Sequence, residues 1–369
     1  MAGIYIHIPF CKQACHYCNF HFATSLHYKN ELVAALLKEI ELQKGYLENE
    51  PVETIYFGGG TPSLCTPDEV QRIIKTIHFV FPVSPAAEVT FEVNPDDITE
   101  EKSQGWKQAG INRLSIGVQS FFDEDLRWMN RAHDAGQALT SLQAAARYFE
   151  NSSVDLIYGT PLLSDEKWKQ NVDTVLSMGI QHLSCYALTV EPKTPLYKMI
   201  KQKTIEDVNP DRQSAQFLLL MQWLADAGFE HYEISNFAKP GHHSRHNSSY
   251  WQGKNYLGIG PSAHSFNGSS RQWNIPNNSG YIESISKEII PFQKEELTPV
   301  QQLNEYIMIS LRTMEGLDLV KVGPAAALSL QTAGRKYVES GLLKLEKNSL
   351  ILTKEGKLLA DGIAAGLFF

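Results

Sequence analysis

The sequence predicts an α/β protein built as a partial (β/α)6 barrel, followed by a small C-terminal domain of helices and a hairpin. Three observations lead to this expectation. Short runs of β-branched and aromatic residues recur along the first half of the chain, and segments with helical apolar spacing lie between them. After residue 298 the order of elements changes. A length of 369 residues can hold one large domain and one small one.

Six candidate strands lie in the first 190 residues, at 3–8, 54–57, 88–93, 113–117, 154–158 and 182–188. Helical apolar spacing follows the first of them, at Leu32, Leu36 and Ile40, and Thr66 with Glu69 predicts a capping box at the start of a second helix. Strands that alternate with helices pair in parallel through right-handed crossovers. Six such units are fewer than the eight of a closed barrel, so we expect an open barrel over residues 1–235.

Residues 236–297 are expected to form a loop-rich segment. A seventh candidate strand at 229–235 follows a helix at 212–227, and residues 239–280 are rich in Gly, Ser, Asn and Pro. A loop of this length in a compact domain usually has a function.

Residues 298–369 are expected to form a winged-helix-like domain. The pattern predicts helices at 300–313 and 323–340, a hairpin at 342–353 that turns at Asn348-Ser349, and a closing helix. This part of the chain carries eight Lys and Arg residues against seven Asp and Glu residues, whereas a DNA-binding module has a clearly basic face. A packing or docking role is therefore favoured over a DNA-binding regulator with a metal sensor.

The composition limits the classes of function. The net charge of −8 argues against general nucleic-acid binding, and no apolar run is long enough for a membrane span. No secretory signal is visible at the start of the chain. Five cysteines, an odd number, then predict a reducing, cytoplasmic compartment, where clustered thiols usually bind metal.

Three of these cysteines, Cys11, Cys15 and Cys18, directly follow the first candidate strand. In barrel-like α/β folds the active site assembles at this end of the strands. Three neighbouring thiolates can bind three corners of an iron–sulfur cube and leave the fourth iron open. Structural zinc is the alternative, with His16 or His21 as the fourth ligand. The spacing favours the cluster.

The second candidate strand is followed by the run Gly58-Gly59-Gly60-Thr61-Pro62. Its glycines allow close approach of a ligand, although an ordinary turn is the simpler reading of the run alone, which matches neither the Rossmann nor the P-loop pattern. Later candidate strands are followed by single polar residues that could face a central cavity: Glu92, Gln119, Arg131 and Asp155. Each one alone is more often a solvated or capping residue.

Together and in this order, these residues resemble the radical S-adenosylmethionine (SAM) superfamily, and Tyr17 supplies the aromatic residue before the last cysteine. The resemblance implies a three-quarter (β/α)6 radical-SAM barrel and a [4Fe–4S] cluster whose open iron binds SAM. An electron from the cluster cleaves SAM to methionine and a 5′-deoxyadenosyl radical. The residues that the resemblance assigns to the SAM site are Tyr5, Tyr17, Gly59, Gly60, Thr61, Glu92, Gln119, Arg131, Asp155 and Ala187.

Over nearly its whole length the chain resembles the branch of the superfamily that contains oxygen-independent coproporphyrinogen III oxidases and HemW heme chaperones. Three features favour the chaperones. Phe20 stands where the oxidase pattern has a fourth cysteine, and only four residues precede Tyr5, whereas the oxidases have an N-terminal extension. The third is a match to the His-Asn-x-x-Tyr-Trp signature of the chaperones, at His246-Asn247-Ser248-Ser249-Tyr250-Trp251.

The signature names four candidate heme-binding residues, His246, Asn247, Tyr250 and Trp251. A neutral imidazole can bind heme iron, and aromatic side chains can cover a porphyrin. The surrounding sequence is rich in histidine, with four of the twelve at His242, His243, His246 and His264. Without the resemblance, His and Asn side chains that hydrogen-bond to the backbone are the simpler reading. With it, His246 is the first candidate for the iron ligand.

The resemblance therefore implies a heme chaperone, not an enzyme, that passes heme to an acceptor hemoprotein such as a respiratory enzyme. The alternative is a radical SAM oxidase that decarboxylates porphyrinogen propionates. No nucleic-acid partner and no membrane span are expected. Three questions stay open at this point: whether heme is held covalently, whether a homodimer forms around it, and whether SAM is cleaved.

Overall fold

Six parallel strands form the centre of the computed structural model, which describes residues 2–369. The strands pair in chain order, each parallel to the next. They are β1 (Ala2–Ile8), β2 (Val52–Gly59), β3 (Val83–Val93), β4 (Arg113–Gln119), β5 (Ser152–Tyr158) and β6 (His182–Ala187). The predicted (β/α)6 partial barrel is confirmed. Its strands are buried along most of their length, but several alternate polar with apolar residues, as β4 does with Arg113, Leu114, Ser115 and Ile116.

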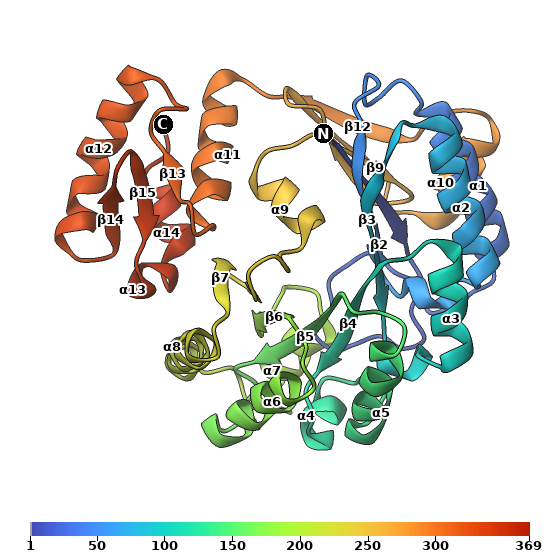
Figure 1. Ribbon diagram of the computed structural model, residues 1–369, viewed down its shortest axis with the longest axis horizontal. Helices are drawn as coiled ribbons and strands as arrows, with labels where there is room; N and C mark the ends of the chain where they lie inside the picture. The colour runs from blue at the N-terminus through green and yellow to red at the C-terminus, as the bar shows by residue number, and fades with distance from the viewer. Residues whose placement is uncertain (1) are drawn as a thin grey trace.

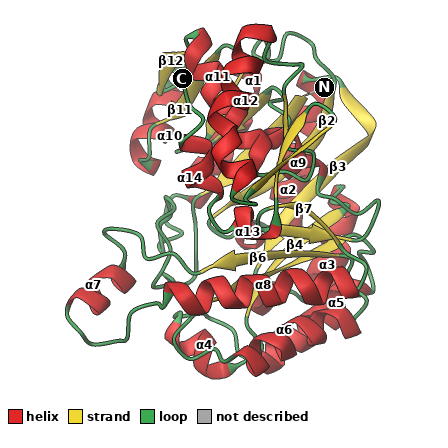
Figure 2. Ribbon diagram, turned by 90° about the vertical axis from the view of Figure 1, so that its left-hand side faces the viewer, coloured by secondary structure: helices red, strands yellow, loops and turns green. Residues whose placement is uncertain are grey.

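Helices cover the outer face of these strands, while α7 extends away from them (Figures 1 and 2). In α1, Leu32, Leu36 and Ile40 are buried, as their spacing predicts. The capping box is also present, because Thr66 and Glu69 each accept a hydrogen bond from the other's backbone N–H. The helices are α1 (Lys29–Leu42), α2 (Pro67–Val80), α3 (Glu100–Ala109), α4 (Asp123–Trp128), α5 (Ala135–Ala146), α6 (Asp165–Ser177), α7 (Pro195–Lys201) and α8 (Pro210–Asp226).

The segment expected to be loop-rich, 236–297, instead contains two helices and most of the strands that extend the sheet. Beyond β6 the sheet continues antiparallel with β8 and then β7, the latter inside the predicted seventh strand. Beyond β1 it continues with β9, which is parallel to β1, and then with β10, β11 and β12. The elements are β7 (Glu230–Glu233), β8 (Asn236–Ala238), α9 (Arg245–Trp251), β9 (Tyr256–Ile259), β10 (His264–Phe266), β11 (Ser270–Asn274), α10 (Asn278–Ser286) and β12 (Phe292–Glu296).

The loop prediction was wrong because these strands are only three to five residues long and carry few β-branched residues. Two of the glycines that suggested a loop are at turns between strands. Gly260 and Gly268 have positive φ angles of 106° and 91°, a conformation that favours glycine.

The C-terminal domain has its own three-stranded sheet and its own apolar core. The predicted helices and hairpin are present, but the hairpin turns at Lys347-Asn348, one residue earlier than predicted. Lys347 adopts a left-handed φ of 53° at this turn. The elements are α11 (Pro299–Leu311), β13 (Leu317–Asp318), α12 (Pro324–Glu339), β14 (Leu343–Glu346), β15 (Ser349–Leu352), α13 (Lys354–Lys357) and α14 (Ala360–Ala365).

The C-terminal domain packs on the open side of the barrel, where α9 lies between the sheet and α11 (Figure 1). Arg312 joins the two parts, because its guanidinium pairs with Glu233 at 3.1 Å and lies 5.2 Å from the centre of the Trp251 ring. A backbone bridge between Glu233 and Thr313 adds to the contact. No helix in residues 2–369 has the length and apolar character of a membrane span.

Candidate functional site

The three cysteines lie on the loop that follows β1, and all three are partly exposed free thiols. The end of β2 holds this loop in place. The backbone N–H of Gly60 donates to the carbonyl of Ile8 at 2.9 Å, and that of Thr61 donates to the carbonyl of Phe10 at 2.6 Å. A Cβ atom on Gly60 would lie 2.5 Å from the Phe10 oxygen. This glycine therefore lets the two backbones approach closely enough to fix the cysteine loop.

Arg131 connects the cysteine loop to two strands of the barrel. One guanidinium nitrogen, Nη1, lies 3.4 Å from Cys15 Sγ, and Nη2 donates to Asn94 Oδ1 at 2.7 Å and to the carbonyl of Gly117 at 2.8 Å. Asn94 follows β3 and Gly117 belongs to β4. The Nε atom of Arg131 is buried and has no partner within the described chain. The guanidinium therefore places a positive charge beside Cys15 and ties the cysteine loop to β3 and β4.

The donor set suits an iron–sulfur cluster. Three thiols on one short loop can bind three irons of a cluster and leave the fourth open, and burial raises the pKa of the Cys11 thiol to about 11 when no metal is bound. Across residues 2–369, no three His, Cys, Asp or Glu side chains are arranged to hold a single metal ion. Each histidine considered for zinc uses one ring nitrogen elsewhere: His16 hydrogen-bonds to the Trp128 carbonyl, and His21 hydrogen-bonds to Asn278.

Two half-buried carboxyls face the interior of the barrel near this loop. Glu92 accepts a hydrogen bond from the Tyr56 hydroxyl at 2.7 Å, and burial raises its pKa to about 7. Asp155 accepts a hydrogen bond from Ser115 at 3.3 Å, and burial raises its pKa to about 6. Neither forms an ion pair with a described Lys or Arg residue. Such carboxyls can accept hydrogen bonds from the amino and hydroxyl groups of a ligand.

The other residues expected at the SAM site surround this interior or the cysteine loop. Tyr5 is on β1, and the Tyr17 side chain packs against an apolar cluster below the loop. Gln119 ends β4 with a φ of 69°, a strained conformation for a residue other than glycine and one often found at functional sites. Ala187 ends β6 and lines a second cavity of about 510 Å³ with Leu188.

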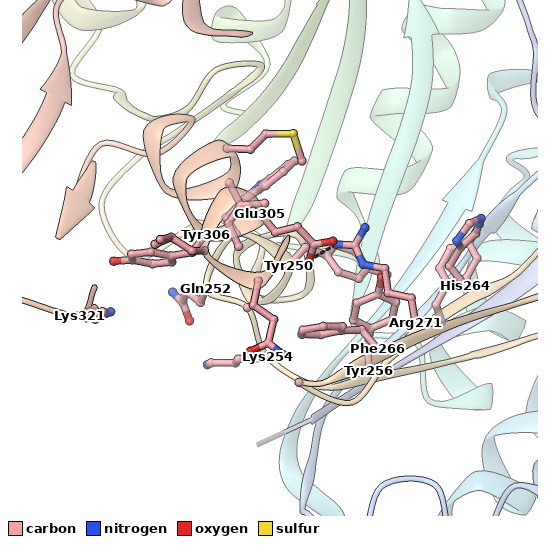
Figure 3. A pocket seen from close by; sticks show the side chains of 18 of the residues that line it. Tyr250, Gln252, Lys254, Tyr256, His264, Phe266, Arg271, Glu305, Tyr306 and Lys321 are labelled. Atoms are coloured by element: carbon pink, nitrogen blue, oxygen red, sulfur yellow. Dashed lines mark ion pairs between the residues drawn. The ribbon is translucent and has the colours of Figure 1, made fainter. Parts of the chain in front are cut away.

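A large cavity of about 1120 Å³ adjoins the cysteine loop (Figure 3). It begins at Phe20 and His21, crosses Tyr5 and the strands β9–β11, and reaches α11 and Lys321 in the C-terminal domain. Its volume is slightly above the usual range for small-molecule sites, roughly 300–1,000 Å³. Aromatic side chains form much of its wall: Tyr5, Phe20, Tyr250, Trp251, Tyr256, Phe266 and Tyr306.

The histidine of the signature motif does not line this cavity. His246 is on α9 and is only 1% exposed. Its Nδ1 hydrogen-bonds to Thr54 Oγ1 at 2.8 Å, its Nε2 to the Tyr250 hydroxyl at 2.9 Å, and its ring stacks on Tyr56. Burial, with a smaller contribution from Arg113, lowers the pKa of His246 to about 3, so the ring is neutral. Both ring nitrogens are engaged, and His246 supports Tyr250 from behind the cavity wall.

The other motif residues differ in their placement. Tyr250 and Trp251 line the cavity, whereas Asn247 lies in the first turn of α9, where its N–H donates to Ser244 Oγ. His243 pairs with Glu230 and lies away from the cavity.

Sequence reasoning missed several residues of the site. Asn94, which binds Arg131, stands two residues after Glu92, a residue that the sequence analysis singles out, so its position was a usable signal. Thr54 and Tyr56 had no such signal, because their contact with His246 depends on the packing of α9 against β2. Lys254 also lines the cavity, and no local sequence pattern indicated this.

Comparison with known proteins agrees with this arrangement. Residues 5–175 match the model of the radical SAM superfamily, and residues 297–359 match that of the HemN C-terminal domain. The fold also matches the structure of Escherichia coli coproporphyrinogen III oxidase (HemN), a radical SAM enzyme, with a TM-score of 0.86 at 22% identity, over 100% of this chain and 90% of that one. The fold and the three-cysteine loop thus define a radical SAM protein.

Two relatives identify the family within the radical SAM superfamily to which this chain belongs. The heme chaperone HemW of Bacillus subtilis is 33% identical over 371 residues, which covers 98% of each chain. The heme chaperone HemW of Mycobacterium tuberculosis is also 33% identical over 371 residues, which covers 99% of this chain and 94% of that one. The chain belongs to the HemW family of radical SAM proteins, which confirms the resemblance found in the sequence. Membership of the radical SAM superfamily implies a [4Fe–4S] cluster and SAM as cofactors.

Proposed function

We propose that this protein binds heme and passes it to an acceptor hemoprotein, and that it carries a [4Fe–4S] cluster with SAM on the open iron. The observation that carries the proposal is the large aromatic cavity that begins beside the cysteine loop and ends in the C-terminal domain. It is large enough for a flat macrocycle, which would pack between aromatic walls. Relatives named heme chaperones align with nearly the whole chain and support the same role.

In this proposal Cys11, Cys15 and Cys18 hold the cluster, and Arg131, whose Nη1 lies 3.4 Å from Cys15 Sγ, positions the cysteine loop. Glu92 and Asp155 accept hydrogen bonds from the amino and hydroxyl groups of SAM, and the remaining residues position it: Tyr5, Tyr17, Gly59, Gly60, Thr61, Gln119, Arg131 and Ala187. When bound, the cluster supplies single electrons and an open iron for SAM.

For the heme, Tyr250 and Trp251 provide cavity wall, and His246 with Asn247 orients the helix that carries them. His246 could bind the iron itself only if its hydrogen bonds to Thr54 and Tyr250 break on heme binding.

Phe20 favours a carrier over the oxidase alternative. Its side chain is 68% exposed and lines the cavity at the end nearest the cysteine loop. It occupies the position of the fourth cysteine in the oxidase pattern, and phenyl offers neither a ligand nor a proton donor. Its role here is contact with an apolar ligand.

The test is anaerobic reconstitution with iron and sulfide, followed by titration with heme, SAM and coproporphyrinogen III. We expect uptake of about one heme per chain and transfer of that heme to an apo-hemoprotein such as apomyoglobin. No decarboxylated porphyrinogen is expected. Failure to take up heme would refute the proposal. Substrate-dependent release of 5′-deoxyadenosine and carbon dioxide would instead establish the oxidase.

A further inference from the structure

Three histidines line the large cavity, and they differ in how their ring nitrogens are used. His7 has none free, because Nδ1 hydrogen-bonds to the Tyr5 hydroxyl at 3.1 Å and Nε2 donates to the carbonyl of His21 at 3.0 Å. His21 uses Nε2 in its 2.7 Å hydrogen bond to Asn278, and its ring stacks on His7. His264 is exposed, and neither of its ring nitrogens has a hydrogen-bond partner in the described chain.

The position of the His264 ring is set by the sheet beneath it. His264 is the first residue of β10 and lies directly opposite Trp273 of β11, and the two rings stack with centroids 6.0 Å apart. The Trp273 indole N–H in turn donates to Gln293 at 3.1 Å. On the neighbouring strand, a Cβ atom on Gly258 would lie 2.1 Å from the His264 carbonyl oxygen, so the close approach of β9 also requires a glycine there. Side chains held on strands keep their geometry better than those on loops.

The chemical state of His264 suits metal binding. Partial burial, followed by the positive charge of Arg271, lowers its pKa, so the ring is neutral at physiological pH and keeps a lone pair. Unlike the two lysines of the cavity, Arg271 has a carboxylate partner, because its Nη2 pairs with Glu305 at 2.8 Å (Figure 3).

The cavity also has cations that could bind carboxylates. Lys321 lies at the end of the cavity opposite His264, and Lys254 lies between them (Figure 3). Neither lysine has a carboxylate partner among the described residues, and the Lys321 ammonium lies 5.9 Å from the centre of the Tyr306 ring. The cavity thus combines a neutral imidazole, aromatic walls and two unpaired cations, as an amphiphilic iron macrocycle with carboxylate arms requires.

We propose that His264, and not His246, binds the iron of heme in this cavity, and that Lys254 and Lys321 pair with the heme propionates. This inference rests on the proposed heme-carrying function. His246 then acts as a positioning residue that holds the Tyr250 hydroxyl at the cavity wall.

The iron ligand can be tested by titrating the purified full-length protein with ferric heme and following its absorption and electron paramagnetic resonance spectra. We expect His264→Ala to weaken binding at least tenfold and to change the spin state of the bound iron. Added imidazole should restore the spectrum of the unmodified protein, which loss of structure could not explain. His21→Ala, the matched cavity variant, should keep the original spectrum. An unchanged spectrum in His264→Ala, or its loss in His21→Ala instead, would overturn the assignment.

The buried His246 needs a variant that keeps its packing, and His246→Gln offers hydrogen-bonding groups of similar reach. We expect this variant to bind heme with the original spectrum, even if affinity falls a few-fold. Loss of the iron-ligand signature in His246→Gln, with a normal melting temperature, would show that His246 is the ligand. If the unmodified protein takes up no heme at all, the proposed function fails, and this result is distinct from failure of the His264 assignment.

The two lysines can be tested with heme dimethyl ester, which lacks the propionate charges. The unmodified protein should bind heme at least tenfold more tightly than the ester. In the double variant Lys254→Ala/Lys321→Ala this preference should fall to two- or threefold, whereas Lys75→Ala on the distant helix α2 should keep it. An unchanged preference in the double variant would contradict the lysine assignment.

Discussion

The guanidinium of Arg131 lies 3.4 Å from Cys15 Sγ, although 116 positions separate the two residues in the sequence. The same guanidinium binds the Asn94 side chain and the Gly117 carbonyl. One side chain therefore fixes the cysteine loop relative to β3 and β4, and the geometry of that loop depends on barrel residues far from the cysteines.

Replacement of Arg131 tests this connection. Arg131→Met would leave the partly buried partners of the guanidinium unpaired, so we expect a loss of about 1–3 kcal/mol in the free energy of unfolding. We also expect at least tenfold weaker SAM binding by equilibrium dialysis after reconstitution. The control Arg147→Met removes an exposed arginine that pairs with Glu100, and it should change neither quantity. Equal effects of the two substitutions would contradict the role given to Arg131.

The cysteines separate into two groups. Cys11→Ala, Cys15→Ala and Cys18→Ala should each abolish the cluster, because a three-cysteine site has no spare thiolate. Cys65→Ala and Cys185→Ala remove buried thiols outside the loop and should retain it. Iron and sulfide content after anaerobic reconstitution measures the difference. A full cluster in any variant of the first group would disprove the assignment of that cysteine.

Gly60 tests the backbone contact beneath the cysteine loop. In Gly60→Ala the new methyl group would lie 2.5 Å from the Phe10 carbonyl oxygen, so the loop must shift. We expect a destabilisation of roughly 1–3 kcal/mol in urea unfolding, together with lower iron occupancy. At Gly45, a Cβ atom would meet nothing within 4 Å, and Gly45→Ala should leave both measurements nearly unchanged.

The free energy of unfolding should depend on pH through the titration of Glu92. Burial raises the pKa of Glu92 in the folded protein from its ordinary value of 4.5 to about 7. Between these values the folded state holds a proton that the unfolded state has lost, so the contribution of Glu92 to stability falls as pH rises from 4.5 to 7.

Glu92→Gln removes this titration. Its advantage over the unmodified protein in urea unfolding should be small at pH 4 and should grow to roughly 3 kcal/mol above pH 7. Glu101→Gln, on the exposed side of α3, is the control and should show no such trend. A constant difference between Glu92→Gln and the unmodified protein across this pH range would show that the carboxyl is not shifted. Since Glu92 is proposed to bind SAM, the more stable variant should bind SAM less tightly.

The parts of the structure that could be predicted from sequence are those with a local signal. The six parallel strands have apolar runs, the capping box joins residues three positions apart, and the cysteines lie within eight residues. In the C-terminal domain the hairpin prediction missed only the register of its turn.

What could not be predicted depends on pairing between distant segments. The strands β9–β12 are too short to show a period, and they form because β1 offers an edge to pair with. The contacts of the His246 side chain also could not be predicted, because they too involve distant segments. Its motif drew attention to the residue, but its neighbours Thr54 and Tyr56 come from β2, and they bury its ring. By contrast, His264 carries no motif and faces the cavity.

The pairing of β1 with β9 places Gly3 beside Tyr256 and thereby joins the start of the chain to its last third. During synthesis, the cysteine loop and the first six strands leave the ribosome long before the residues that complete the cavity. One edge of β1 therefore stays unpaired until β9 has been synthesised, and an unpaired strand edge is prone to aggregation. The cysteine loop can take its place on the nascent barrel, whereas the large cavity is complete only once β9–β11 and α11 have been made. The order of these segments in the sequence thus lets the barrel form before the cavity.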